Sequence, residues 1–184
     1  MADLVHRRGY LAVGVEDVCK AAGVKKGSFY HFFSSKRELM LAALERQQHM
    51  AHAHVLATAF QADLPPLQRI DRLFAMVAGM ETSNKNRGGR VLGCPFGNIA
   101  VEMSASEPKL ARRADQAFCG FASFIADALR EAKKRGEIER DVNIDETADA
   151  IVAYFEGLAV LAKTRNDPAL LRRLGRHAVL LAKG

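Results

Sequence analysis

The sequence predicts an all-α protein, in which a small three-helix helix-turn-helix module precedes a larger helical body. Alanine and leucine dominate the composition, β-branched residues are sparse, and no stretch alternates apolar and polar residues for long enough to indicate a sheet. Glycine and proline divide the chain into about nine helical segments. Segments before residue 46 are short and those after it are long and amphipathic, so we expect domains at 1–46 and 47–184.

Each predicted element is bounded by a residue that breaks or caps a helix. Pro65 and Pro66 can occupy a first helical turn, and so can Pro108. The stretch Ser83–Gly93 is polar and rich in glycine, which predicts a loop. The predicted helices are one that ends at Gly9, one that ends at Gly23, a short one before Ser34, Lys36–Phe60, Leu67–Met80, a short one after Pro95, Pro108–Gly136, Asp145–Thr164 and a last one after Pro168.

Composition excludes several classes of protein. At 184 residues, 49% hydrophobic and 26% charged, the chain has the size and balance of an ordinary globular protein. Its three cysteines are widely spaced, so they form neither a disulfide framework nor a metal site, and we predict a cytoplasmic protein without a cofactor. No stretch suits a signal peptide or a membrane span. The net charge is +6, and residues 1–50 carry half of that excess, which favours an anionic partner of the N-terminal module.

The strongest pattern in the chain lies between Val15 and Phe33. Apolar residues recur at helical spacing before Gly23, and that glycine permits the positive φ that a sharp turn between two helices requires. A helix-turn-helix has this form, and its second helix enters the major groove of DNA. The residues expected to pack inside it are Val15, Val18, Cys19, Ala22, Val24 at the corner, Phe29, Phe32 and Phe33.

The outward side of the second helix carries groups suited to phosphates and base edges. Lys36 follows the predicted Ser34–Ser35 cap, where backbone N–H groups already favour an anion. An ordinary helical hairpin with a solvated basic face is the alternative. The predicted DNA-binding residues are Lys25, Lys26, Gly27, Ser28, Tyr30, His31 and Lys36.

The stretch from Gly9 to Glu45, with its AAGV-x-KGSFYHFF-x-SK core, resembles the DNA-binding domain of the TetR family of transcriptional regulators. This resemblance implies an all-α fold whose C-terminal domain binds a small ligand and dimerises. It also implies that the second helix of the motif recognises DNA and that Lys36 clamps a phosphate. Family members have more residues before the first helix, so we expect that helix to be shortened here. Gly14 stands where the family usually has Ser or Thr.

Two helices near the C-terminus are candidates for a dimer interface. The helix Asp145–Thr164 has apolar residues on two sides, and the helix after Pro168 adds further leucines. Paired with a symmetry mate, they would form an isologous four-helix interface. Burial within one subunit is the alternative. With the resemblance, we expect a homodimer through these last two helices.

The candidate effector site centres on the string GCPFGN-x-A-x-E, which includes Cys94 and follows the predicted loop. A helix N-terminus lowers the pKa of a thiol and raises its reactivity. The string resembles a TetR-family subset, some of whose members sense small electrophiles or unsaturated carboxylates. A small buried cysteine in a tight helix start is the alternative. The predicted ligand-binding residues are Phe74, Cys94, Phe96, Asn98, Glu102, Phe118 and Phe121.

Together these features predict a homodimeric transcriptional regulator, a repressor that a small-molecule effector releases from double-stranded DNA. Each subunit would read one half-site of a near-palindromic operator. One alternative is a helical interaction protein with weakened DNA binding. Another is an enzyme with Cys94 as nucleophile, but the sequence offers no adjacent base and no catalytic metal motif, so we expect no enzyme.

Overall fold

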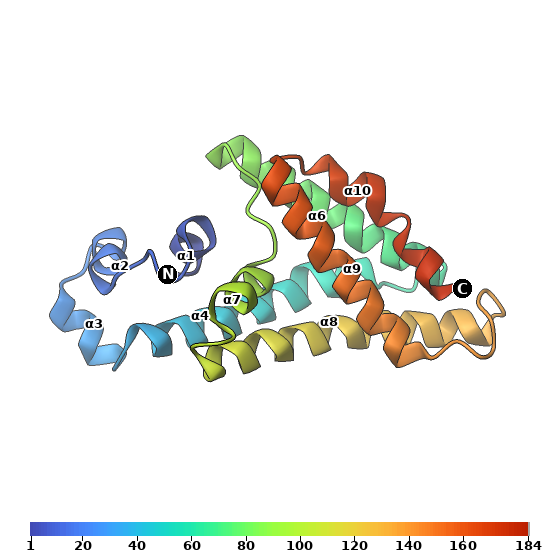
Figure 1. Ribbon diagram of the computed structural model, residues 1–184, viewed down its shortest axis with the longest axis horizontal. Coiled ribbons are helices and arrows are strands. Elements are labelled where there is room, and N and C mark those ends of the chain that lie inside the picture. The colour runs from blue at the N-terminus through green and yellow to red at the C-terminus, as the bar shows by residue number, and fades with distance from the viewer. Residues whose placement is uncertain (184) are drawn as a thin grey trace. The chain divides into compact units, whose positions relative to one another are not determined.

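The computed structural model describes residues 1–183, and within them every regular element is helical (Figure 1). The all-α prediction is therefore confirmed for this part of the chain. The chain forms two compact units, one of residues 1–49 with 95–116 and one of residues 50–94 with 117 onward. The predicted boundary at residue 46 assigned residues 95–116 to the C-terminal domain. The structure instead groups these residues with the N-terminal module. Over the described residues, no helix is both long and apolar enough to cross a membrane.

The first unit holds the helix-turn-helix module. Its two motif helices are α2 (Val15–Ala22) and α3 (Lys26–Phe32), and the turn between them contains Gly23 with a φ of 67°. Ser35 accepts the N–H of Glu38 through its hydroxyl, and the Glu38 carboxylate accepts the N–H of Ser34, so a reciprocal cap begins α4 (Lys36–Ala51). The helices of this unit are α1 (Ala2–Arg8), α2 (Val15–Ala22), α3 (Lys26–Phe32), most of α4 (Lys36–Ala51), α7 (Pro95–Met103) and the start of α8 (Pro108–Lys134).

The inward residues of the motif differ in part from the prediction. Phe29 is buried, but Phe32 is 75% exposed, Val24 is 45% exposed and Ala22 is exposed, so the predictions for these three residues are wrong. Helix α3 ends at Phe32, and Phe33 is extended with a φ of −135°. The chain therefore changes direction at this point, and the Phe33 ring lies 6.1 Å from that of Phe29.

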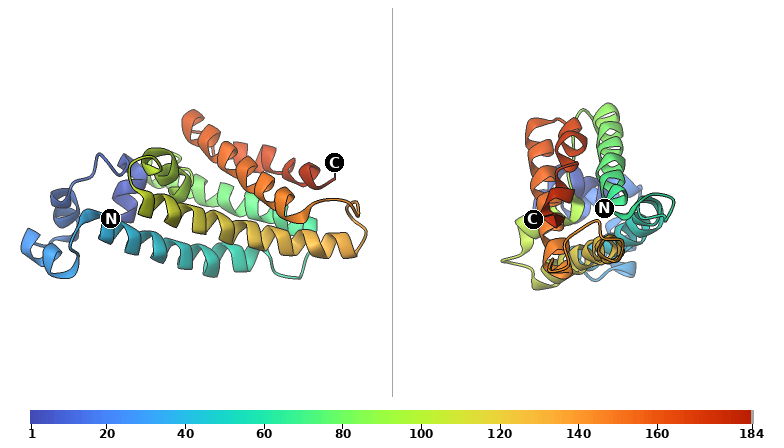
Figure 2. Two further views of the ribbon diagram at one scale, coloured as in Figure 1. Left: turned by 60° about the horizontal axis from the view of Figure 1, so that its bottom comes forward. Right: turned by 90° about the vertical axis from the view of Figure 1, so that its right-hand side faces the viewer.

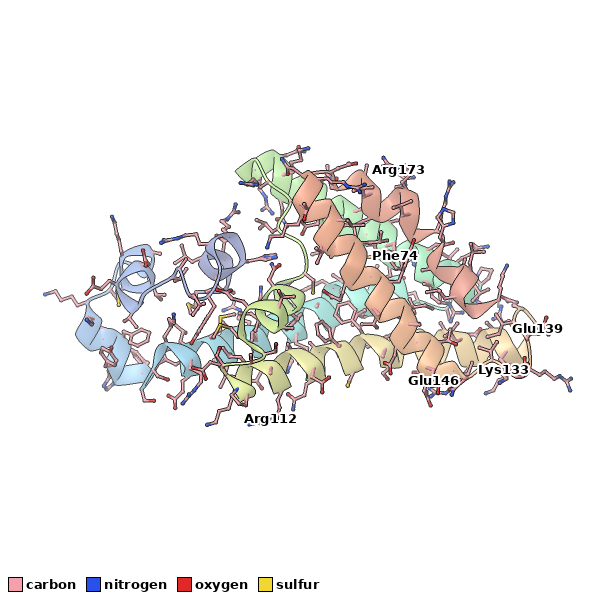
Figure 3. The ribbon with its side chains drawn as sticks, in the orientation of Figure 1. Phe74, Arg112, Lys133, Glu139, Glu146 and Arg173 are labelled. Atoms are coloured by element: carbon pink, nitrogen blue, oxygen red, sulfur yellow. The ribbon has the colours of Figure 1, made fainter. Side chains whose placement is uncertain are left out.

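The second unit packs long helices around one hydrophobic core. Helices α6, α9 and α10 lie side by side in both views of Figure 2. Phe74 lies among them (Figure 3), and its ring is 5.6 Å from that of Phe155. A Cβ atom at Gly175 would lie 2.5 Å from the Phe74 side chain, so α10 approaches α6 closely. The elements of this unit are η1 (His52–Leu56), α5 (Ala57–Ala59), α6 (Pro66–Gly88), the rest of α8, α9 (Ile144–Arg165), α10 (Ala169–Gly175) and η2 (Ala178–Ala182).

Two predicted boundaries in this unit need correction. The loop predicted from Ser83 begins only at Gly89, because α6 continues through Gly88. Polar side chains one turn apart support the extra turns, as in the 3.0 Å hydrogen bond from the Asn84 amide to Glu81. The run predicted as one helix from Lys36 to Phe60 contains a π-helical segment, η1, between α4 and α5.

Candidate DNA-binding face and effector site

The outward face of α3 is polar and open. Lys25, Lys26, Gly27, Ser28, Tyr30 and His31 are all exposed. Tyr30 is 52% exposed, and its ring packs edge-on against the buried Phe29 at 5.0 Å. The contact fixes the base of the Tyr30 ring while its hydroxyl remains at the surface. Lys26 forms an exposed ion pair of 3.4 Å with Glu16, which solvent screens strongly.

Lys36 is placed at the start of α4, as the cap predicts, but its described contacts are with the protein itself. Its Nζ atom donates hydrogen bonds of 3.0 Å to the carbonyl oxygens of Tyr10 and Val13. The same atom lies over the Tyr10 ring, which is buried. The phosphate contact expected for Lys36 thus stays a prediction, whereas a contact with the α1–α2 turn (residues 9–13) is present.

Glu102, which the sequence assigned to the effector site, also contacts the α1–α2 turn. Its carboxylate accepts the backbone N–H groups of Tyr10 and Leu11, each at 2.8 Å. A Cβ atom at Gly9 would lie 3.1 Å from a Glu102 carboxylate oxygen, so the carboxylate rests against bare backbone. Both residues belong to the first unit.

In the second unit, residues 89–94 form a strap that leads from α6 to Cys94. The Asn166 side chain accepts the N–H of Val91 at 2.9 Å and donates to the carbonyl of Gly89 at 3.1 Å. The buried Glu81 carboxylate accepts the N–H of Leu92 at 2.7 Å. Because these partners lie on α6 and at the end of α9, the strap is attached to both helices.

Cys94, at the end of the strap, has a partly buried carboxyl beside its thiol. The thiol hydrogen-bonds the Glu156 carboxyl, which comes from α9. Burial raises the pKa of Glu156 to about 7, and the hydrogen bond from Cys94 opposes that rise. A group with such a pKa exchanges protons readily near neutral pH. The structure therefore places beside Cys94 a candidate base that the sequence did not reveal.

Aromatic residues predicted for the effector site surround this part of the core. Cys94, Phe118 and Phe121 pack against the same hydrophobic cluster, to which Phe74 belongs. The Phe121 ring stacks on that of Phe155 with centroids 6.0 Å apart. Four predicted residues, Phe74, Cys94, Phe118 and Phe121, thus lie in the second unit. Phe96, Asn98 and Glu102 belong to the first.

Glu156 is the functional candidate that the sequence analysis missed. It is the sole charged residue between Asp149 and Lys163 on a helix that is otherwise apolar there. A lone carboxyl in such a run is a recognisable signal, because burying an ionised group is costly. The sequence does not show that Glu156 meets Cys94, because 62 positions separate the two residues and the path of the strap brings them together.

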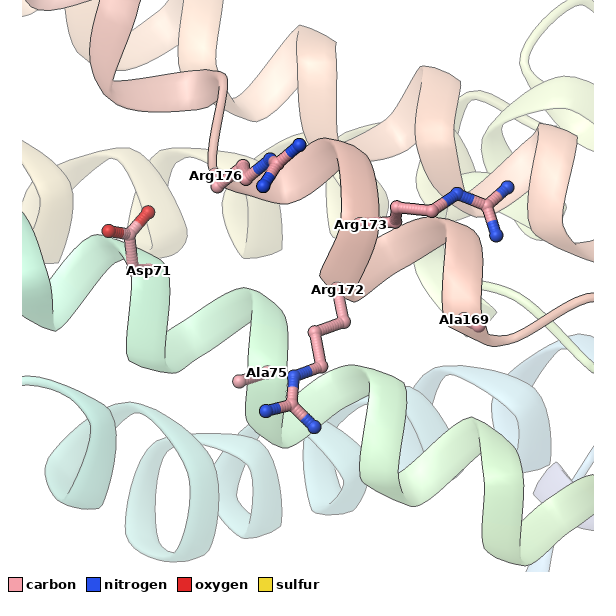
Figure 4. Close-up of a pocket in the computed structure, with 6 residues that line it drawn as sticks. All are labelled: Asp71, Ala75, Ala169, Arg172, Arg173 and Arg176. Atoms are coloured by element: carbon pink, nitrogen blue, oxygen red, sulfur yellow. The ribbon is translucent and has the colours of Figure 1, made fainter.

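A basic groove lies between α6 and α10, and its lining includes none of the predicted ligand residues (Figure 4). It has a volume of about 510 Å³, and Arg172 and Arg173 of α10 line one side of it together with Arg176, which directly follows that helix. Burial raises the pKa of Asp71 on the opposite side. The residues that line the groove are Asp71, Ala75, Ala169, Arg172, Arg173 and Arg176.

Two elements of the second unit expose large apolar side chains. Val160 is 52% exposed in the C-terminal third of α9, beside the exposed Leu161. Leu180 and Leu181 are exposed on η2, which packs against α9. By contrast, one apolar stripe of α9 is buried within the subunit: Ala148, Ile151, Val152, Phe155, Ala159 and Ala162.

Comparison with known proteins agrees with this arrangement. Residues 2–43 match the family model described as bacterial regulatory proteins of the tetR family. Residues 66–178 match the model described as the tetracyclin repressor-like C-terminal domain. The two matches cover both the helix-turn-helix module and most of the helical body.

Individual relatives span most of the chain. Transcriptional regulator AcuR of Cereibacter sphaeroides is 36% identical over 177 residues, which cover 94% of this chain and 78% of that protein. The HTH-type transcriptional repressor DhaR of a Mycobacterium species is 29% identical over 160 residues, or 87% of this chain and 77% of that protein. The crystal structure of regulatory protein TetR from Rhodobacter sphaeroides matches with a TM-score of 0.81 at 33% identity, covering 96% of this chain and 94% of the other.

Proposed function

The chain belongs to the TetR family of bacterial transcriptional regulators, and from this premise we propose that it is a dimeric repressor whose DNA binding is relieved by an electrophile that reacts with Cys94. Regulators of this family are typically ligand-responsive repressors. DNA binding is supported by one observation on α3: its polar face is exposed, while the buried Phe29 anchors its other side. Each α3 helix would enter the major groove at one half-site of a near-palindromic operator.

We assign separate roles on α3 according to what each side chain offers. Lys25 and Lys26 supply charge to phosphates, and Ser28, Tyr30 and His31 supply donors and acceptors at the groove floor. Gly27 has open space where a Cβ would be, which lets the helix backbone approach the DNA.

Dimerisation through α9 and the C-terminal η2 follows from the exposed apolar surface. Val160, Leu161, Leu180 and Leu181 are exposed apolar side chains that are costly to leave in water, and a two-fold copy of the same elements would cover them. Gly157 lies one turn before Val160, and a Cβ atom at Gly157 would have no neighbour within 4 Å, so a second helix can approach there. A dimer also places two α3 helices on one duplex.

The effector site proposed here consists of Cys94, Glu156 and the aromatic residues Phe74, Phe118 and Phe121. An α,β-unsaturated carbonyl compound would react by addition: the Cys94 sulfur bonds to the β-carbon, the carbon–carbon π bond breaks, and Glu156 passes the thiol proton to the α-carbon. Atoms and charge balance without a further reactant. The adduct then favours a conformation with lower DNA affinity, which requires that it interact differently with the two states.

A salt titration of DNA binding tests the core of this function. Fluorescence anisotropy with a labelled duplex from the region upstream of the protein's own gene should give a steep negative slope of log affinity against log salt concentration. Tyr30→Ala should weaken binding while the dimer persists in sedimentation velocity. If no duplex, including one enriched from a random pool, shows salt-dependent binding, the proposal fails.

A second experiment tests the effector. The protein is treated with N-ethylmaleimide, and peptides are analysed by mass spectrometry for modification at Cys94. Cys119 is exposed and serves as the internal reactive standard. Modification of Cys94 with loss of DNA affinity, and no loss in Cys94→Ser, is the expected result. An inert Cys94 beside a modified Cys119 would remove the electrophile from the proposal.

A further inference from the structure

The α1–α2 turn has one internal backbone hydrogen bond, from Val13 N–H to the Tyr10 carbonyl at 3.3 Å, and side chains from three helices hold it further. Its N–H groups at Tyr10 and Leu11 bond to Glu102, and its carbonyls at Tyr10 and Val13 accept from Lys36. Arg8 donates to a third carbonyl, that of Ala12, at 3.0 Å. Because backbone polar groups need partners, these side chains support the form of the turn.

Of these three side chains, Glu102 alone comes from outside the DNA-binding sequence. It lies in the last turn of α7, a helix of nine residues. Its two 2.8 Å hydrogen bonds are charge-assisted and bidentate, which makes them the most directional contact on the turn. Gly9 has a φ of 87° and no side chain, and both properties are needed for the carboxylate to approach.

The other end of α7 is covalently joined to the strap. Pro95, the first residue of α7, directly follows Cys94. The strap is itself fixed to α6 and α9 through Glu81 and Asn166. A short, regular helix therefore runs from the residue after Cys94 to the carboxylate that holds the α1–α2 turn.

We propose that Glu102 is a positioning residue for DNA binding, and that α7 passes a displacement of the strap to the α1–α2 turn through its carboxylate. The turn sets how α2 follows α1, and α2 in turn supports α3. This inference rests on the proposed DNA binding but not on the identity of an effector. It gives the last residue of the GCPFGN-x-A-x-E string a role in coupling rather than in ligand contact.

The first arm of the test needs no DNA. Hydrogen exchange measured by NMR on the intact protein should show the Tyr10 and Leu11 amides exchanging at least about tenfold faster in Glu102→Gln, because one charged acceptor is lost. Glu102→Asp keeps the charge on a shorter side chain, so its exchange rates at the two amides should lie between those of the native protein and Glu102→Gln. If Glu102→Gln does not fold, Glu102→Asp takes its place in the comparison. Unchanged exchange at both amides would overturn the proposal.

The second arm is a double-mutant cycle on DNA affinity. Gly93→Ala perturbs the strap, since Gly93 has a φ of 74° and its Cβ would lie 3.4 Å from the Ala159 carbonyl oxygen. It should change DNA affinity by about fivefold or more in the otherwise native protein and by less than about twofold in Glu102→Gln. Additive effects of the two substitutions would show that Glu102 does not carry the coupling.

The matched control is Glu107→Gln, which removes a different carboxylate contact in the same unit, the 3.2 Å ion pair with Arg37. Its effect should add to that of Gly93→Ala, because the Glu107 carboxylate accepts a hydrogen bond from Arg37 rather than from the backbone of the turn. If Glu102 only stabilised the fold, Glu102→Gln and Glu107→Gln would combine with Gly93→Ala in the same way. That result would also refute the proposal. If the native protein binds no DNA, the proposed function fails while the exchange arm still tests the contact.

Discussion

The Nζ atom of Lys36 lies 4.0 Å from the centre of the Tyr10 ring and donates to the carbonyl oxygen of the same residue. One cation thus joins the start of α4 to the α1–α2 turn by two different interactions. We predict that Lys36→Ala weakens DNA binding about tenfold by loosening the turn. A role confined to the turn would leave the slope of log affinity against log salt concentration unchanged, because no phosphate contact would be lost.

Fluorescence anisotropy at several salt concentrations measures that slope. A decrease of about one per subunit would instead assign Lys36 to a phosphate. Lys25→Ala is the comparison, because Lys25 is exposed next to α3 and should reduce the slope.

Phe29 and Tyr30 are adjacent in sequence and opposite in role. We predict that Tyr30→Ala lowers DNA affinity about tenfold with little change in the free energy of unfolding, because the ring is exposed. Phe29→Ala should destabilise the protein by about 3–5 kcal/mol, since its ring is buried. Chemical denaturation and DNA titration of both variants separate the two effects. Equal destabilisation would show that the α3 orientation is wrong.

The carboxyl of Glu156 should make stability depend on pH. Its pKa is raised to about 7 in the folded protein, above the ordinary value of 4.5, so the folded state holds this proton more tightly than the unfolded state. Its contribution is fully present below the ordinary value and is lost as pH rises through about 7. Glu156→Gln cannot ionise and should gain about 1–3 kcal/mol relative to the native protein between pH 5 and pH 8.

Thermal or urea unfolding of both proteins at these two pH values measures the difference. A constant difference would mean that Glu156 ionises normally in the folded state. The same variant should also slow modification of Cys94 by N-ethylmaleimide at pH 7, because the thiol loses its proton acceptor.

The exposed surface of α9 should control the oligomeric state. We predict that Val160→Asp shifts the protein from dimer to monomer at micromolar concentration, because two like charges would face each other across the two-fold axis. Val101→Asp is the matched control: Val101 is 82% exposed, but it lies on α7 in the other unit. Sedimentation velocity distinguishes the two. A dimer that survives Val160→Asp would exclude this surface as the interface.

Two glycines test the packing of α6. A Cβ at Gly175 would collide with Phe74, whereas a Cβ at Gly79 would have nothing within 4 Å. Gly175→Ala should therefore destabilise the protein by about 1–3 kcal/mol. Gly79→Ala, within a regular helix, should stabilise it by about 0.5–1 kcal/mol. Urea unfolding of the two variants gives both changes in the free energy of unfolding. Changes of the same sign would contradict the close approach of α10 to α6.

Local sequence patterns determined the helices and the helix-turn-helix motif of this protein. The spacing of apolar residues around Gly23 and the Ser35 cap defined the helix-turn-helix, because helix periodicity, turns and caps depend on residues within a few positions of each other. The same reasoning placed Tyr30 outward. The same reasoning was wrong for Phe32, which it placed inside the motif. Phe32 is the last residue of α3, and at a helix end a shift of one residue decides whether a ring points inward or to solvent.

Tertiary structure alone decided which distant groups meet. Glu102 lies 92 positions from Tyr10, and its place on α7 suggested a ligand until the chain brought it to the α1–α2 turn. Cys94 gained its base in the same way, from Glu156 on α9. A carboxylate's role depends on what surrounds it, since burial and partners set both its pKa and its hydrogen bonds. The sequence could therefore identify the chemical groups and the helices, while only packing between helices could pair them.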